Sequence, residues 1–168
     1  MATLKNQVMS LVKKGAFDEA VALAFAAVEQ DAASAEAWSV LSHAQEIAGD
    51  IESALRSASK AVELINDEPA YWFQRGWLNL LVDSAGDSLS DMQQVLALGR
   101  SLNNAYYSEM AAFLAAESLR RLRRYEEALD QCAGVRDDFT VHVGLPLSKA
   151  CLVKTCSLAL RHTETFAA

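Results

Sequence analysis

The sequence is poor in residues that interrupt helices or build cross-linked and metal-binding sites. Its 168 residues include only 2 prolines, 7 glycines, 3 cysteines and 3 histidines. Few prolines and few β-branched runs, together with abundant alanine, leucine, glutamate and arginine, predict a helical chain. Cys132, Cys151 and Cys156 are odd in number and lack the paired spacing of a disulfide framework or a zinc site, so we expect reduced thiols.

Long apolar runs are also missing, although 52% of the residues are hydrophobic. No stretch approaches the roughly 20 apolar residues that are needed to span a bilayer. Lys5, Asn6 and Gln7 interrupt the N-terminal segment, where an export signal needs an unbroken apolar core. We therefore expect a soluble, cytoplasmic protein.

Net positive charge is absent as well. There are 15 Lys and Arg against 22 Asp and Glu, which gives a net charge of -7 and a pI near 4.9. Such a surface repels phosphate groups, so neither nucleic acid nor an anionic membrane is an expected partner. The four arginines within residues 120–124 are followed at once by Glu126 and Glu127, which favours a solvated helix end over a dedicated anion site.

Residue clusters that carry catalysis or bind cofactors are not apparent. The three histidines, His43, His142 and His162, lie far apart, and no glycine run resembles a phosphate-binding loop. Adjacent carboxylates such as Asp137 and Asp138 point to different sides of a helix or turn, not toward one substrate. The sequence predicts no enzyme activity, no cofactor and no metal. An enzyme with an unrecognised polar cluster is the least favoured alternative.

What the sequence has instead is a repeat of 34 residues. Residues 15–21, Gly-Ala-Phe-Asp-Glu-Ala-Val, return as residues 49–55, Gly-Asp-Ile-Glu-Ser-Ala-Leu. The same step joins Trp38 to Trp72. A period of 34 built from two amphipathic helices is the signature of the tetratricopeptide repeat, and the chain resembles this family.

The resemblance implies an all-α fold, a right-handed superhelix of about four antiparallel helix pairs that ends in a capping helix. The whole chain, residues 1–168, is predicted to be a single domain. The expected repeats are residues about 1–34, 35–68, 69–108 and 109–142, and the capping helix covers about 146–162. We expect essentially no strand, a turn around Gly144 and Pro146, and a frayed tail from His162 onward.

The third repeat departs from the regular pattern. Asp83 stands where the turn glycine is expected and Gly86 follows three residues late, which predicts a longer turn or a later second helix. The step from Ser88 to Ala128 is 40, six more than the period. The extra residues are expected near residues 99–107.

In proteins of this family the first helix of each pair lines a concave groove that holds a peptide, and the resemblance implies such a groove here. Its middle is aromatic, because Phe73 and Trp77 lie four residues apart on one helix face. These rings are either binding hot spots or core, whereas Trp72 is expected to pack within its helix pair. The implied lining is Lys5, Met9, Ser39, His43, Glu46, Phe73, Gln74, Trp77, Leu80, Phe113, Glu117, Arg120 and Arg121.

The resemblance therefore predicts a non-enzymatic scaffold or adaptor that binds a protein or peptide. One alternative is a bacterial protein dedicated to one partner, as an immunity protein or a secretion chaperone, and another is a self-associating homo-oligomer. Tyr106 and Tyr107 either cover a seam between repeats or form a secondary contact. The two-carboxylate clamp for acidic chaperone tails is not matched, because Met9 stands where an asparagine is expected.

Overall fold

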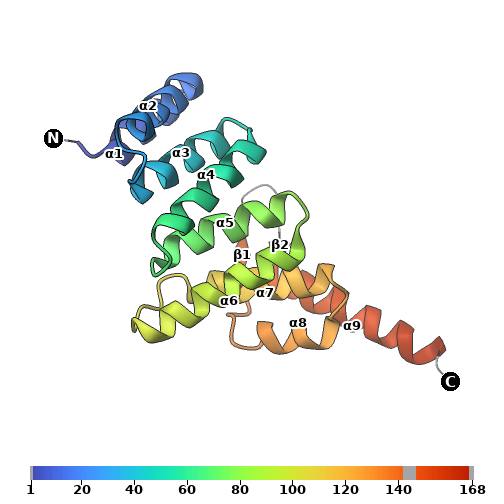
Figure 1. The fold of residues 1–168 in the computed structure, drawn as a ribbon. Helices are drawn as coiled ribbons and strands as arrows, with labels where there is room; N and C mark the ends of the chain where they lie inside the picture. The colour runs from blue at the N-terminus through green and yellow to red at the C-terminus, as the bar shows by residue number, and fades with distance from the viewer. Residues whose placement is uncertain (1, 142–146, 167–168) are drawn as a thin grey trace. The chain divides into compact units, whose positions relative to one another are not determined.

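The computed structural model of the chain describes residues 2–141 and 147–166. In this part of the chain nine helices follow one another, with one short hairpin before the last (Figure 1). The all-α prediction is confirmed. The helices form two compact units, which we call the N-terminal unit, Met1–Asp83, and the C-terminal unit, Ser84–Ala168. That the two units behave as one domain stays a prediction.

The N-terminal unit contains five helices, and each packs on its neighbours in sequence. They are α1 (Leu4–Lys13), α2 (Phe17–Gln30), α3 (Ala35–Ile47), α4 (Ile51–Leu64) and α5 (Pro69–Leu81). Thr3, Ser34 and Asp50 start three of them, since each side chain accepts a hydrogen bond from a first-turn N–H. The first helices α1, α3 and α5 also contact one another in that order.

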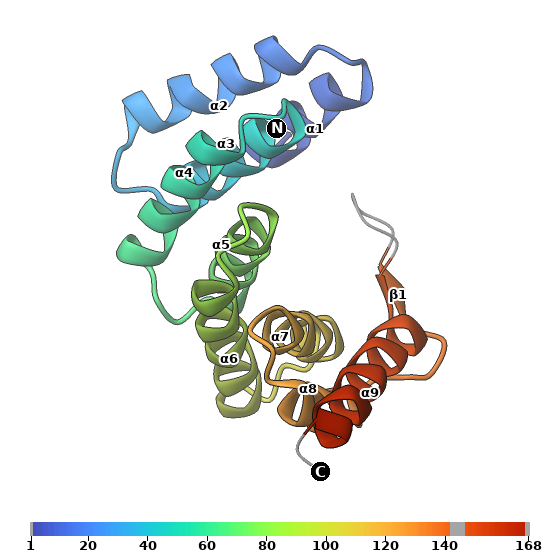
Figure 2. The same ribbon diagram turned by 90° about the vertical axis from the view of Figure 1, so that its right-hand side faces the viewer.

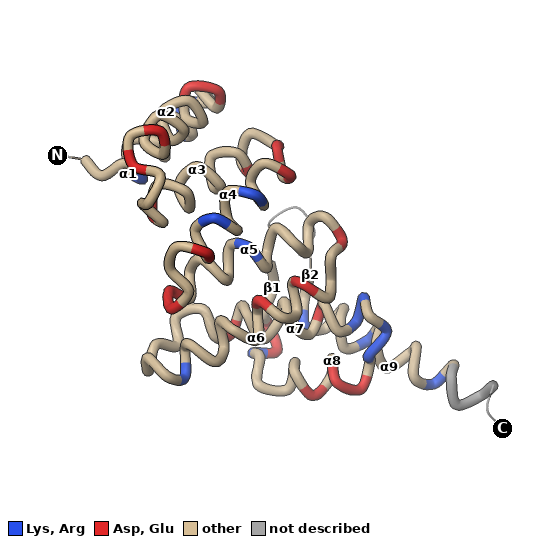
Figure 3. Tube along the Cα trace, in the orientation of Figure 1, with Lys and Arg blue, Asp and Glu red and all other residues tan. Residues whose placement is uncertain are grey.

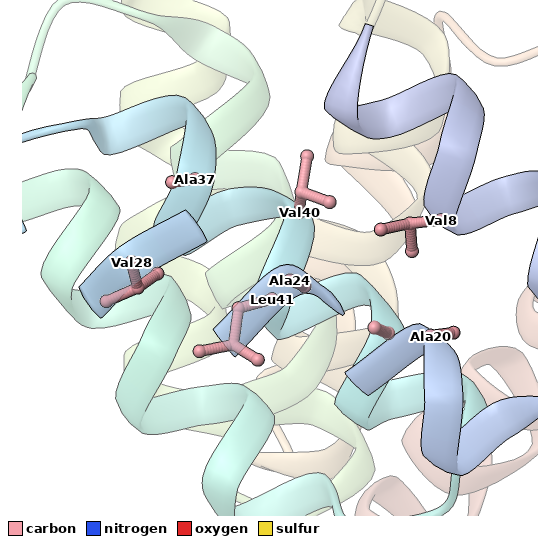
Figure 4. Packing of buried hydrophobic residues seen from close by; sticks show 8 residues of the cluster. Val8, Ala20, Ala24, Val28, Ala37, Val40 and Leu41 are labelled. Carbon is pink, nitrogen blue, oxygen red and sulfur yellow. The ribbon is translucent and has the colours of Figure 1, made fainter. Parts of the chain in front are cut away.

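Small side chains let the helices of the N-terminal unit approach closely. Ala20 and Ala24 of α2 are fully buried against Val8 of α1 and Leu41 of α3 (Figure 4). The repeat brings Ala54 and Ala58 of α4 to the same positions, and both are fully buried too. An alanine at a helix contact buries no polar group and leaves no space for a larger side chain, so these positions fix the register of the repeat.

The C-terminal unit consists of four helices and a small hairpin. The elements are α6 (Ala85–Ser101), α7 (Ser108–Arg121), α8 (Tyr125–Cys132), β1 (Thr140–Val141), β2 (Leu147–Ser148) and α9 (Lys149–Phe166). β1 and β2 pair antiparallel, and α9 lies beside α8 (Figure 2).

Several sequence predictions for the C-terminal segment need correction. The hairpin was not expected, and it forms where residues 140–141 can pair with residues 147–148. Helix α9 begins at Lys149 and continues to Phe166, so the expected frayed tail from His162 is wrong over the described residues. The predicted turn around Gly144 and Pro146 lies outside the described residues.

All four repeats share one turn between their first and second helices. Gly15, Gly49, Asp83 and Arg123 have φ values of 76°, 88°, 61° and 61°, and the second helix begins two residues later in every case. The prediction of a longer third turn is therefore wrong. Asp83 takes the left-handed conformation that glycine adopts elsewhere, which aspartate tolerates better than most residues.

The six extra residues of the third repeat lie where the sequence predicts them. Helix α6 has 17 residues, against 14 in α2 and in α4, and a loop over residues 102–107 follows it. The loop folds back on the helix, because the Asn104 N–H donates to the Gly99 carbonyl at 2.8 Å. A Cβ at Gly99 would lie 2.9 Å from the Asn104 oxygen, so the turn requires glycine.

Two tryptophans repeat one contact at a distance of 34 residues. The indole N–H of Trp38 donates to the carbonyl of Ala32 at 2.9 Å, and that of Trp72 donates to the carbonyl of Asn66 at 2.8 Å. Each tryptophan thus braces the loop that leads into its own helix. Both side chains are only partly buried, and Arg75 stacks over the Trp72 ring, so Trp72 is less enclosed than the sequence predicts.

Candidate functional site

Helices α3 and α5 bring five of the predicted groove residues together in the N-terminal unit. The Ser39 hydroxyl donates to Gln74 Oε1 at 2.8 Å, and Gln74 Nε2 donates to the Ser39 carbonyl at 3.1 Å. This reciprocal pair links two side chains that are 35 residues apart. It fixes both rotamers on adjacent first helices.

A second polar contact lies further along the same two helices. The Trp77 indole N–H donates to Glu46 Oε1 at 2.7 Å, and His43 Nδ1 lies 3.4 Å from Glu46 Oε2. The His43 side chain is 43% exposed and that of Glu46 17% exposed. One carboxylate therefore orients both an imidazole and an indole at the surface.

We call the surface formed by these side chains the first-helix face. Its residues are Ser39, His43, Glu46, Gln74 and Trp77, together with Phe73, which we include because it lies four residues before Trp77 on α5. All six are partly buried. Trp77 also packs against Ala54, Ala58 and Leu78, so it belongs both to this surface and to the core beneath it. The predicted residues on α1 are less enclosed, because Lys5 is exposed and Met9 partly buried.

Three of the predicted groove residues are core residues instead. Leu80 is 3% exposed, and Phe113 and Glu117 of α7 are 0% and 1% exposed. The Phe113 ring packs against Phe139, with ring centroids 5.0 Å apart. These side chains are not available to a partner, and their assignment to the groove is wrong.

Glu117 is held by two arginines that were also assigned to the groove. Its carboxylate accepts two hydrogen bonds from Arg120, both at 2.7 Å, and one from Arg121 Nε at 2.9 Å. The pKa of Arg120 is raised, chiefly by its hydrogen bonds to Glu117. The charge of Glu117 is thus compensated inside the C-terminal unit, because a buried carboxylate needs such partners.

The segment that covers α7 lies outside the repeat. The backbone N–H of Arg136 and its Nε both donate to Glu109 Oε1, at 3.0 and 2.9 Å, and Phe139 covers Phe113. The Lys149 N–H donates to the Phe139 carbonyl at 3.0 Å. We call residues 135–141 the covering segment. The only sequence signal for it is a pair of apolar residues, Phe139 and Val141, beyond the last repeat.

The tyrosine pair between α6 and α7 is at the surface. The Tyr106 side chain is 82% exposed, and its ring meets that of Tyr107 edge to face, with centroids 4.8 Å apart. Tyr106 does not cover a seam between repeats. Tyr107 is partly buried, so both sequence interpretations stay open for it, and a secondary contact at Tyr106 stays a prediction.

Thiols and carboxylates form no second candidate centre in the part of the chain that the structure describes. Cys132 and Cys156 are buried, and burial raises the pKa of both thiols, whereas Cys151 is exposed. Over residues 2–141 and 147–162, no three His, Cys, Asp or Glu side chains are placed to hold a metal ion. No helix among the described residues is long and apolar enough to cross a membrane.

No protein-family model matches the chain, and no curated protein is similar to it in sequence. Solved structures are similar in fold. The MamA AMB-1 structure is 15% identical, with a TM-score of 0.71 over 96% of this chain and 81% of that chain. The TPR2B domain of yeast Sti1 in its pHsp70 complex is 13% identical, with a TM-score of 0.65 over 70% and 94%.

A third similar structure is that of YrrB, described as a TPR protein with an unusual peptide-binding site. It is 18% identical, with a TM-score of 0.65 over 77% of this chain and 64% of that chain. Sequence identities this low establish the fold alone. The 34-residue period, the four equivalent turns and these similarities together show that the chain has the tetratricopeptide-repeat fold.

Proposed function

We propose that this protein is a non-enzymatic scaffold that binds another polypeptide on its first-helix face. One observation carries the proposal. Helices α3 and α5 are joined by two hydrogen bonds between partly exposed side chains, Ser39–Gln74 and Glu46–Trp77, which fix polar and aromatic groups on the first-helix face.

The first-helix face has the composition and rigidity of a binding surface. Aromatic side chains supply most of the energy at protein interfaces, and polar groups around them set register and specificity. Side chains whose rotamers are already fixed lose less entropy when a partner docks. The hydrogen bonds of Gln74 and Trp77 therefore lower the entropy cost of binding, because they fix these side chains in the free protein.

The comparisons support a polypeptide as the partner. The Sti1 TPR2B domain is seen in its pHsp70 complex, and YrrB is described with a peptide-binding site. In this chain the N-terminal unit carries 6 Lys and Arg against 12 Asp and Glu, a net charge of -6. Acids outnumber cations on it (Figure 3). An acidic peptide would be repelled, so the partner segment is neutral or basic near this face.

The test begins with the partner that a tagged chain captures in its own host, identified by mass spectrometry and then purified. Phe73→Ala is expected to weaken this partner by about 30-fold, or 2 kcal/mol, the loss typical of an aromatic hot spot. Phe25→Ala is the matched control, because Phe25 is an exposed phenylalanine on the second helix α2. Titration calorimetry gives the affinities and circular dichroism confirms the fold.

Equal affinity of the partner for wild type and Phe73→Ala would reject the first-helix face. A loss with Phe25→Ala that matches the loss with Phe73→Ala would also reject it. Tyr106→Ser tests the secondary contact in the same titration. We expect a smaller loss there, because Tyr106 lies on an exposed loop and not among fixed side chains.

A further inference from the structure

Helix α7 shows how a first helix of this chain accepts a turn, because the Phe139 N–H donates to the Arg136 carbonyl at 3.1 Å and residues 136–139 form a hydrogen-bonded turn. The covering segment places the guanidinium of Arg136 on Glu109, near the start of α7, and the ring of Phe139 on Phe113, one helical turn later. The segment therefore uses a cation followed three residues later by an aromatic ring. It is an intramolecular example of binding to a first helix.

Helix α5 carries similar groups at matching positions. Phe73 stands 10 residues before the left-handed turn residue Asp83, as Phe113 stands 10 before Arg123. Glu68 stands 15 residues before its turn residue and Glu109 stands 14 before, so the two acids differ by one position. Both first helices thus begin with a carboxylate and carry a phenylalanine about one turn further on.

A second carboxylate lies at the same end of the first-helix face. Glu36 and Glu68 are both exposed, at the starts of α3 and α5. The pKa of Tyr71 is raised, first by burial and then by the negative charges of Glu68 and Glu36. The two carboxylates thus stand at the starts of two helices that contact each other. We call Glu36 and Glu68 the acidic edge of the face.

We propose that the first-helix face binds a peptide segment that forms a turn, in which lysine or arginine is followed three residues later by an aromatic residue. The cation contacts the acidic edge, and the aromatic ring packs beside Phe73 and Trp77. This inference rests on the proposed function and specifies its partner. The charge of -6 on the N-terminal unit favours such a segment over a neutral one.

The dimensions agree with this assignment. From Glu68 to Phe73 a helix rises about 7.5 Å, at about 1.5 Å per residue. The Cα atoms of the first and fourth residues of such a turn lie less than about 7 Å apart. A lysine or arginine side chain is long and flexible enough to take up the difference.

The experiment uses the full chain and a short fluorescein-labelled peptide, Gly-Val-Arg-Ala-Ala-Phe-Thr-Val. It copies residues 134–141 with both aspartates replaced by alanine, which removes the charges that the acidic edge would repel. Fluorescence polarisation measures its affinity. We expect replacement of the peptide phenylalanine by alanine to weaken binding at least tenfold. Replacement of the arginine by glutamine should weaken it about fivefold at low salt.

Protein variants locate the peptide. Glu36→Gln with Glu68→Gln should weaken the parent peptide about fivefold and leave the affinity of the glutamine peptide unchanged, because the lost contact is then already absent. Glu29→Gln with Glu52→Gln is the control, since it removes two exposed charges from the second helices α2 and α4. This control should change neither affinity.

Three results would overturn the inference. These are no measurable binding, equal binding of all three peptides, and a loss of binding through Glu109→Gln but not through the acidic-edge variant. The partner titration separates this failure from that of the proposed function. If the peptide fails while Phe73→Ala still weakens the purified partner, the face binds a segment of other chemistry. If Phe73→Ala leaves the partner's affinity unchanged, both proposals fail.

Discussion

The two units treat equivalent positions of their first helices differently. In the N-terminal unit Phe73 and Trp77 are partly exposed, whereas in the C-terminal unit Phe113 and Glu117, which occupy the same places in the repeat, are fully enclosed. For Phe113 the difference comes from the covering segment, whose Phe139 packs on it, whereas Glu117 is paired with Arg120 and Arg121. A repeat position therefore has no fixed role, because its role depends on what packs over it.

The two units also differ in net charge. The C-terminal unit has 9 Lys and Arg against 10 Asp and Glu, a net charge of -1, compared with -6 in the N-terminal unit. Three of its seven arginines hold carboxylates of α7, with Arg120 and Arg121 on Glu117 and Arg136 on Glu109. The C-terminal unit thus uses its charges to close a surface, and the N-terminal unit leaves an excess of negative charge facing solvent.

The largest expected effect separates the two phenylalanines. Phe113→Ala should lower the free energy of unfolding by about 3 to 5 kcal/mol, as truncation of an enclosed ring does. Phe73→Ala should cost clearly less, about 1 to 2 kcal/mol, because its ring is only partly buried. Urea unfolding followed by circular dichroism measures both. Similar losses for the two variants would remove the contrast between the units.

The second largest loss of stability is expected for Glu117→Gln. The variant keeps the shape but removes the carboxylate that Arg120 and Arg121 share, which should cost about 2 to 3 kcal/mol. The loss stays below that of a fully buried pair, because both arginines are partly exposed. Glu127→Gln removes the exposed pair with Arg124 and should change the melting temperature little. A melting temperature that is as high for Glu117→Gln as for Glu127→Gln would show that Glu117 does not hold α7.

Two glycine substitutions should have opposite signs. Gly49 has a φ of 88°, so Gly49→Ala should destabilise the N-terminal unit by about 1 kcal/mol. Gly86 lies in the first turn of α6 with open space around its Cβ position, so Gly86→Ala should stabilise by up to about 1 kcal/mol. Thermal melts of both variants check this. A stabilising Gly49→Ala would contradict the shared turn.

The smallest effect concerns pH and the contact between Glu109 and Arg136. The pKa of Glu109 is lowered, first by the hydrogen bond from the Arg136 backbone N–H and then by that from its side chain. A lowered folded pKa gives stability that is present above the unfolded value near 4.5 and is lost as the pH falls through the folded pKa. The difference in melting temperature between wild type and Glu109→Gln should therefore shrink from pH 6.5 to pH 3. A difference that grows as the pH falls would have the wrong sign.

The repeat made most of the fold predictable. A shared period of 34 identifies the turn at Gly15 and Gly49 and the buried alanines Ala20 and Ala54, because each has one geometric role in every copy. The regular turn at Asp83 is not predictable, because an aspartate can adopt the left-handed conformation but its presence alone does not indicate it. The six extra residues near Gly99 are predictable, because an insertion shifts the repeat positions of all residues that follow it.

The site was less predictable, for a physical reason. Ser39, Gln74 and Trp77 lie on one face as expected, because helical spacing determines which side chains share a face. Helical spacing does not reveal what covers a face. The burial of Phe113 is not predictable from the repeat, because the covering segment is not part of it and contacts α7 from 20 or more residues away in sequence.

Hydroxyl-radical footprinting of the wild-type chain, with and without the purified partner, tests the contrast between the two units most directly. It needs no substitution, and mass spectrometry reads the oxidation rate of each aromatic side chain. We expect Phe73 and Trp77 to be oxidised in the free chain and protected in the complex, and Phe113 to be protected in both. Rapid oxidation of Phe113 in the free chain, or unchanged rates at Phe73 and Trp77 in the complex, would contradict the account.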